Sequence, residues 1–152
     1  MGKGKFYTII YRIIFFFKIK GIKNLNVGGK ITVSSKNTIT LQGKAYFGPN
    51  CYLGANLNVD GDLLVGPNVC FVGDDHRIPK RSEKTSYIDS GRDILREIKI
   101  EKNVWIGANS TILTGVTLAE GSIIAAGTVV TKSTKPYTIY GSSKQFKIKE
   151  II

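Results

Sequence analysis

Residues 104–130 read VWIGANSTILTGVTLAEGSIIAAGTVV, and every sixth residue from Ile106 to Val130 is aliphatic. The same step of six extends outward from this stretch, from Leu41 to Phe71 and again from Ile100, with one long break between the two blocks. The twelve apolar positions are Leu41, Phe47, Leu53, Val59, Val65, Phe71, Ile100, Ile106, Ile112, Leu118, Ile124 and Val130. Neither a helix, with its period of 3.6, nor an ordinary strand, with its period of 2, produces this spacing. A short fixed repeat is typical of a solenoid, in which stacked coils bury a continuous core.

A second pattern follows the first. For ten of the twelve apolar positions, the residue three places later is Asn, Asp or Gly. These ten residues are Asn50, Asn56, Asp62, Asn68, Asp74, Asn103, Asn109, Gly115, Gly121 and Gly127. These residue types most readily adopt the left-handed or turn conformations of a corner. The position after the corner is often small or β-branched, which suits a narrow interior. We therefore expect short strands joined by corners into a triangular prism of about eighteen residues per coil, with coils spaced by ~4.8 Å.

Three segments carry a family resemblance: Ile106–Ser110, Leu118–Ser122 and Ile124–Thr128. They resemble the hexapeptide repeats of left-handed parallel β-helix acyltransferases. Residues 104–132 are similar to the galactoside, maltose and xenobiotic O-acetyltransferases and to bacterial O-antigen and capsule acetyltransferases. The resemblance covers roughly residues 41–149. It implies an all-β, left-handed parallel β-helix that assembles as a homotrimer, with active sites in clefts between subunits.

The chain divides into three expected regions. Residues 1–22 are predicted to form an apolar, basic N-terminal helix, and residues 23–135 the β-helix acyltransferase domain. Within that domain residues 73–98 leave the repeat and are polar, and a long irregular segment in a compact domain is usually functional. Residues 136–152 are expected to be a basic C-terminal tail.

Composition narrows the function classes. The 152 residues suit one domain, and the net charge of +11 favours anionic ligands such as coenzyme A phosphates, a nucleotide- or lipid-linked sugar, or an acidic membrane surface. The lysines lack an aromatic-interleaved nucleic-acid motif, so no nucleic-acid partner is expected. Cys51 and Cys70 are read as reduced thiols of a cytoplasmic protein. A single histidine excludes the three-histidine zinc site of a carbonic anhydrase, and no metal is predicted.

Residues 6–19 are apolar and aromatic, with flanking lysines and Arg12 in the middle. The segment is too short to span a bilayer. One interpretation is a peripheral helix at the anionic inner face of a membrane. The other is a helix packed on the solenoid or on a neighbouring subunit, because solenoid ends need capping. The sequence leaves both open.

His76 is the candidate catalytic residue. It lies in the break, within Gly73–Arg77, which resembles the catalytic-histidine loop of the sugar and xenobiotic acetyltransferases. A neutral imidazole, whose unperturbed pKa is ~6.5, can take the proton of an attacking sugar hydroxyl and pass it to the departing thiolate. We expect direct attack without an acyl-enzyme. The alternative is a surface histidine in a polar loop.

Other site residues are expected around this histidine. Asp74 or Asp75 could fix the imidazole tautomer, although turn carboxylates in solvent would look the same. Arg77 could meet an anionic substrate or be solvated, and Asp75 is also a candidate for a substrate contact. Asn58 is the candidate for the acceptor sugar. The resemblance places Trp105 in the cleft for substrate and acetyl-CoA, or at a subunit interface.

The resemblance also implies contacts to the acetyl-CoA donor. Ala108 falls near the thioester carbonyl, where related enzymes place a small residue, so backbone N–H groups near Gly107 and Ala108 would have to steady the oxyanion. The remaining donor-binding candidates are Ala126, Thr131, Lys132 and Lys149. Residues 141–146 depart from the turn that is usual in the family, which affects the nucleotide end of the donor site.

Three functions remain in competition. The first is an acetyl-CoA-dependent sugar O-acetyltransferase, in surface polysaccharide biosynthesis. The second is an N-acetyltransferase acting on an amino sugar nucleotide, which would share the cleft, donor and base. The third is a non-catalytic β-solenoid scaffold, which would need neither the histidine loop nor Thr131 and Lys132.

Overall fold

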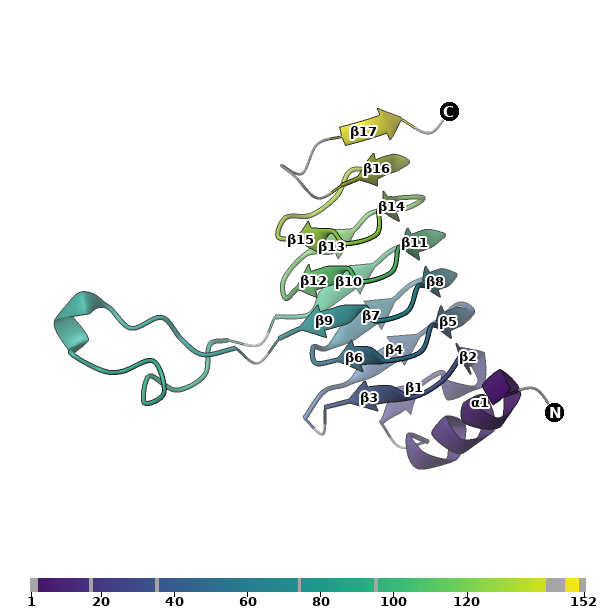
Figure 1. Ribbon diagram of the computed structural model, residues 1–152, viewed down its shortest axis with the longest axis horizontal. Helices are drawn as coiled ribbons and strands as arrows, with labels where there is room; N and C mark the ends of the chain where they lie inside the picture. The colour runs from purple at the N-terminus through teal and green to yellow at the C-terminus, as the bar shows by residue number, and fades with distance from the viewer. Residues whose placement is uncertain are drawn as a thin grey trace.

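The protein is a stack of short parallel strands with a helix at one end and a long arm on its side (Figure 1). The structure is a computed structural model, and it describes residues 3–16, 18–34, 36–73, 75–94, 96–141 and 147–150. Three parts of the sequence predictions lie outside the described residues: Asp74 beside the histidine, Phe17 in the apolar segment 6–19, and residues 142–146 in the C-terminal tail.

The strands form three sheets, one for each face of the prism. Face A contains β1 (Ile19–Lys20), β4 (Ile39–Leu41), β7 (Leu57–Val59), β10 (Ile98–Ile100) and β13 (Thr117–Leu118). Face B contains β2 (Leu25–Val27), β5 (Ala45–Phe47), β8 (Leu63–Val65), β11 (Val104–Ile106), β14 (Ile123–Ile124), β16 (Thr138–Tyr140) and β17 (Lys147–Glu150). Face C contains β3 (Ile31–Val33), β6 (Cys51–Leu53), β9 (Cys70–Val72), β12 (Thr111–Leu113) and β15 (Val129–Val130). All these neighbours pair in parallel except β16 and β17, so the predicted parallel β-helix is confirmed.

The core consists of the residues that the six-residue period selects. All twelve are at most 3% exposed. Phe47 and Phe71 meet inside with ring centroids 6.1 Å apart in an edge-to-face arrangement. Burying each large side chain contributes about 1.5–3 kcal/mol. The small residues after the corners are buried as well, and the hydroxyls of Ser110 and Thr128 both donate to the Ala125 carbonyl.

The corners are formed in two different ways. Seven predicted corner residues have a positive φ: Asn50, Asn68, Asn103, Asn109, Gly115, Gly121 and Gly127. Asn56 and Asp62 do not, and they serve their corners through side-chain oxygens instead. Oδ1 of Asn56 accepts the Thr38 N–H at 2.9 Å, and Oδ1 of Asp62 accepts the Lys44 N–H at 2.9 Å. In both cases the donor belongs to the preceding coil, so these corners also bind neighbouring coils together.

The long break does not interrupt the stack. Ile98 in β10 pairs with Leu57 in β7, and Trp105 in β11 pairs with Leu64 in β8, as if no residues had been inserted. The corners on the two sides of the break are also hydrogen-bonded to each other, because Nδ2 of Asn68 donates to Oδ1 of Asn109 at 3.0 Å. The chain between β9 and β10 is therefore an arm added to a complete solenoid.

The stack extends beyond Pro136, where the sequence had suggested its end. Ile139 of β16 pairs in parallel with Ile123 of β14, and β17 then adds an antiparallel strand. At the opposite end lies α1 (Lys3–Ile14), followed by β1 and the 3-10 helix η1 (Ile22–Asn24). In the described part of the chain no helix is long and apolar enough to cross a membrane.

Candidate functional site

The arm between β9 and β10 carries the only histidine of the chain and projects away from the coils (Figure 1). Its base is a short antiparallel pairing: His76 bridges Arg92, the Arg77 N–H donates to Gly91 O at 3.1 Å, and the Asp93 N–H donates to Asp75 O at 2.9 Å. Beyond it the 3-10 helix η2 (Arg81–Glu83) turns the chain back. The arm is thus a hairpin-like projection with internal order.

His76 is exposed and lies in a shallow hollow beside Tyr87 and Ile88. Oδ1 of Asp75 accepts the backbone N–H of His76 at 2.8 Å. That bond is a local turn contact, so this carboxylate oxygen acts on the backbone and not on the imidazole. The hollow leaves the histidine available to a substrate or to another surface.

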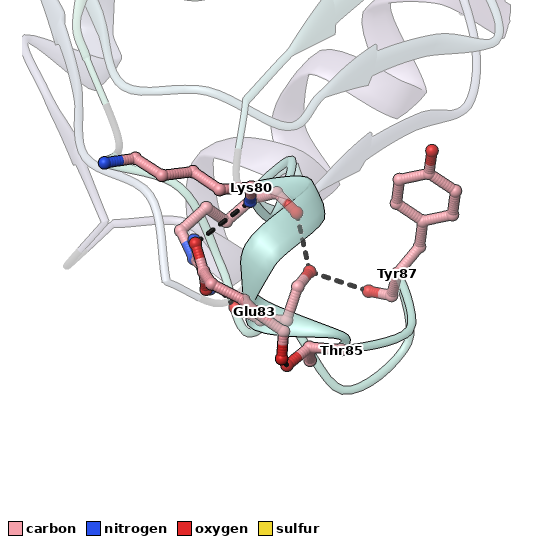
Figure 2. A network of polar contacts seen from close by, with 6 residues as sticks. Lys80, Glu83, Thr85 and Tyr87 are labelled. Carbon is pink, nitrogen blue, oxygen red and sulfur yellow. Dashed lines mark hydrogen bonds and ion pairs between the residues drawn. The ribbon is translucent and has the colours of Figure 1, made fainter.

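Arg77 is held by the arm itself. Its guanidinium forms a two-point ion pair with Glu83, at 3.0 Å and 2.5 Å, and its Nε donates to Ser90 O at 3.1 Å. The Lys80 N–H also donates to Glu83, and Figure 2 shows this network closing η2. The guanidinium and the Lys80 N–H together lower the pKa of Glu83 to about 2. Arg77 therefore orders the arm, and the sequence could not indicate this because its partner is chosen by the fold of the loop.

Trp105 lies at the centre of an outward patch on face B. It is 50% exposed and is flanked in register by Leu64 and Ile123. Together with Tyr46 and Tyr137 these residues line a shallow, mainly apolar pocket of about 530 Å³. An aromatic surface of this kind can hold an apolar or ring-shaped group.

Ala108 and Ala126 occupy equivalent corners of successive coils, where face B turns into face C. The Gly127 N–H donates to Ala108 O at 2.8 Å, which ties the two corners together. A Cβ on Gly107 would lie 2.6 Å from the Ala126 nitrogen, so close stacking requires glycine there. The Gly107 N–H already donates to Ile124 O at 2.7 Å, so it is not available to an oxyanion, contrary to one of our expectations. Ala108 is the remaining candidate.

The other predicted residues are spread around the prism. Thr131 and Lys132 follow β15 and are exposed at the corner between faces C and A. Asn58 is half-buried in the middle of β7 on face A, between Thr40 and Lys99. Lys149 lies in β17, where its backbone is in register with Ile139.

Only some of these residues are neighbours within one chain. Ala108 and Ala126 stand together, and Trp105 lies on the strand that leads to Ala108. The arm with His76 leaves the prism at a different corner, after β9 of face C. The distribution over faces A, B and C is what a cleft shared between chains would require.

Sequence reasoning missed the outward patch around Trp105. Tyr46 and Leu64 are eighteen residues apart, as are Trp105 and Ile123, so each pair stacks on face B. This outward eighteen-residue spacing is the signal that could have found it. In the described ranges no group of three His, Cys, Asp or Glu side chains could hold a metal ion. Burial raises the pKa of the Cys51 thiol, which makes it a poor nucleophile.

Comparison with known proteins finds similarity to hexapeptide-repeat proteins. Residues 97–132 match the family described as hexapeptide repeat of succinyl-transferase. A galactoside O-acetyltransferase from Lactococcus lactis is 35% identical over 91 residues, which are 57% of this chain and 44% of the relative. The galactoside O-acetyltransferase of Escherichia coli is 31% identical over 114 residues, 70% of this chain and 54% of the relative. The chain therefore spans about half the length of these two relatives.

A solved structure supports the same relationship. A galactoside acetyltransferase in complex with coenzyme A superimposes with a TM-score of 0.67 and 26% identity, covering 85% of this chain and 66% of the other. The repeat, the parallel β-helix and these similarities show that the chain resembles hexapeptide-repeat proteins, and in particular acetyltransferases among them.

Proposed function

We propose that the chain is an acetyl-CoA-dependent O-acetyltransferase that acts on a sugar hydroxyl. The observation that carries the proposal is the arm: the solenoid pairs across it without interruption, so packing of the coils does not require it. The arm nevertheless presents the only histidine in an open hollow. The galactoside O-acetyltransferases among the relatives, and a relative that binds coenzyme A, supply the reaction class and the donor.

In the proposed mechanism His76 is the general base. Its neutral imidazole takes the proton of the acceptor hydroxyl as that oxygen attacks the thioester carbonyl. The tetrahedral intermediate then collapses, the carbon–sulfur bond breaks, and the imidazolium returns the proton to the coenzyme A sulfur. The Ala108 backbone N–H is assigned to the oxyanion. The pantetheine arm is assigned to Ala126 before β15 and to Thr131 and Lys132 after it.

The acceptor and the assembly belong to the same proposal. We assign the sugar to Trp105, with Asn58 as a further polar contact, and the active assembly to a homotrimer whose clefts combine faces of two chains. Beyond the His76–Arg92 bridge the arm carries three strongly exposed apolar side chains, which would be covered in such a contact: Ile78, Tyr87 and Ile88. A sugar of a surface polysaccharide or its nucleotide- or lipid-linked precursor is the proposed acceptor.

The test is the His76→Ala variant with Ile94→Ala, also on the arm, as its control. Calorimetric titration with acetyl-CoA measures donor binding, and release of free thiol in a panel of hydroxyl and amino sugars measures turnover. We expect His76→Ala to lose about a hundredfold to ten-thousandfold in kcat, since general-base catalysis supplies ~10²–10⁴. Donor affinity should be unchanged, and Ile94→Ala should stay active.

Near-wild-type turnover of His76→Ala would remove the mechanism. Turnover on amino sugars alone would replace O-acetylation by N-acetylation, the second function that the sequence allows. Failure of the wild-type protein to bind acetyl-CoA would favour the scaffold function.

A further inference from the structure

The N-terminal helix places polar groups against the solenoid and exposes apolar side chains on its outer side. The side chains that α1 turns towards the solenoid include Thr8, Tyr11 and Arg12. Those turned outward are apolar: Phe6 (51% exposed), Ile9 (50%), Ile13 (72%), Ile14 (60%) and, just beyond the helix, Phe16 (63%). A helix on a globular protein normally buries its apolar stripe and exposes its polar one.

The inward polar groups have a structural role that explains their placement. The first coil has no coil before it, so backbone groups of β2 and β3 at the end of the stack lack strand partners. Thr8 Oγ1 accepts the Val27 N–H at 3.0 Å, and the Tyr11 hydroxyl accepts the Ile31 N–H at 3.0 Å. Arg12 donates to Leu25 O at 2.7 Å and to Lys23 O at 2.6 Å. The helix thus caps the open edge with the polar groups of its inner face, and its side chains Ile9, Ile13 and Ile14 lie on the outer face.

The inner aromatic residues pack against the core, and the outer side chains Phe6, Ile9 and Ile13 are at least half exposed. Tyr7, Tyr11 and Phe15 stack along the inner side, with ring centroids 6.3 Å and 5.5 Å apart. Phe6, Ile9 and Ile13 follow one another at spacings of three and four residues, so they form a continuous outward stripe. Capping therefore accounts for the inner face of α1 and leaves the outer stripe without a function.

The charge distribution indicates what covers this stripe. Of the 22 basic and 11 acidic residues in the chain, residues 1–59 contain nine basic ones and no acidic one. The nine are Lys3, Lys5, Arg12, Lys18, Lys20, Lys23, Lys30, Lys36 and Lys44. Among them Lys5, Lys20, Lys23 and Lys30 are exposed. Residues 1–59, which comprise α1 and the strands from β1 to β7, thus carry nine of the eleven net positive charges, and α1 lies at the end of the stack opposite β17 (Figure 1).

We propose that this end of the solenoid docks on an anionic lipid surface, with Phe6, Ile9, Ile13 and Phe16 inserted among the lipids and the lysines against the headgroups. An outward apolar stripe with surrounding lysines is the pattern of a helix that lies in the membrane interface. The docked solenoid stands with its coils stacked away from the membrane. The proposal stands independently of the acetyltransferase reaction.

Flotation of the purified full chain with lipid vesicles tests the proposal. We expect the protein to float with vesicles of phosphatidylcholine and phosphatidylglycerol, not with phosphatidylcholine alone, and to be released by high salt. Ile13→Asp should weaken binding by about tenfold or more, because an apolar side chain no longer enters the lipid. Ile94→Asp is the matched control, since Ile94 is 76% exposed on the arm, and it should bind like the wild type.

A second pair of variants tests the charge. Lys23→Gln, at the helix end, should weaken binding by roughly fivefold, the effect of ~1 kcal/mol per lysine near an anionic surface. Lys135→Gln, an exposed lysine near the other end of the stack, should have no effect. Circular dichroism melting should be the same for all variants, because none of these side chains is buried.

Two outcomes would overturn the proposal. The first is that the wild type fails to float with phosphatidylglycerol vesicles, or that Ile13→Asp and Ile94→Asp float equally well. The second is a loss of oligomer mass in Ile13→Asp by light scattering without any vesicle binding by the wild type, which would show that a second copy of the chain covers the stripe.

Discussion

Single residues of the arm show how local hydrogen bonds decide the role of a polar side chain. Arg77 and Asp75 neighbour His76 in sequence, and both were candidates for substrate contacts. Arg77 is instead engaged by Glu83 and Ser90, and an Asp75 oxygen by the His76 backbone. His76 alone of the three faces an open hollow. The arm thus shapes and presents one side chain.

The Arg77–Glu83 pair predicts a pH dependence of the arm. The pKa of Glu83 is lowered to about 2 in the folded protein, against ~4.3 for a free glutamate. The stabilising contribution is therefore fully present above the free value and is lost as the pH falls towards about 2. In a carbon-13 NMR titration of the side-chain carboxyl, Glu83 should titrate near the lower value. In Arg77→Gln its pKa should rise but stay below the ordinary value, because the Lys80 N–H still donates to the carboxylate. An ordinary midpoint in the wild-type protein would contradict the ion pair.

At the scale of elements, the coils and the arm are separable. Strands β7, β8 and β9 pair directly with β10, β11 and β12, so the core is continuous on both sides of the arm. In the arm, η2 buries none of its residues, and only Ser90 is buried among the described residues 75–94. Stability resides in the coils, and the arm is free to serve binding and chemistry.

Replacement of residues 75–94 by a short Gly-Ser linker tests this separation. We expect the variant to keep the β-rich circular dichroism spectrum and a melting temperature within a few degrees of the wild type, because the core is untouched. Acetyl transfer should be lost entirely. If the variant unfolded as an isolated chain, the arm would have to be counted as part of the fold. If it kept activity, His76 would not be the base.

At the scale of the whole molecule, the proposed active site combines residues of more than one chain in the proposed trimer. His76 leaves the prism from the end of face C, whereas Trp105 lies on face B. The basic, helix-capped end lies at the opposite end of the stack from β17 (Figure 1). In the two proposals the lateral faces of the prism carry out acetyl transfer and one end of the stack binds lipid. A trimer could therefore bind lipid and transfer acetyl groups at the same time.

Subunit complementation measures whether the site is shared. His76→Ala and Trp105→Ala should each be inactive alone. After mixing equal amounts, unfolding and refolding together, a cyclic trimer with shared sites should regain about a quarter of the wild-type activity, since a quarter of its clefts then combine two intact residues. Sites contained within single chains would give no recovery, and light scattering of the mixture verifies that trimers have formed.

Most of the fold was predictable because every coil has the same pattern of buried apolar residues and corner residues. The buried positions from Leu41 to Val130 and seven corners with positive φ follow from residue type and spacing alone. The exceptions are corners such as Asn56 and Asp62, where a side chain bonds to the coil before it. That contact depends on which residues lie eighteen positions away and on the completed stack.

What the sequence by itself determined is the solenoid, its core and the position of the histidine in an insertion. A six-residue period leaves one way to bury every apolar side chain, so local pattern and global fold agree. Only the tertiary structure decided that Arg77 serves the arm, that Tyr46 and Trp105 share a pocket, and that α1 turns its apolar face outward. The physical reason is common to all three: unsatisfied polar groups and neighbouring surfaces far away in the sequence select the partner of each side chain. A sequence pattern records the side chain but not that partner.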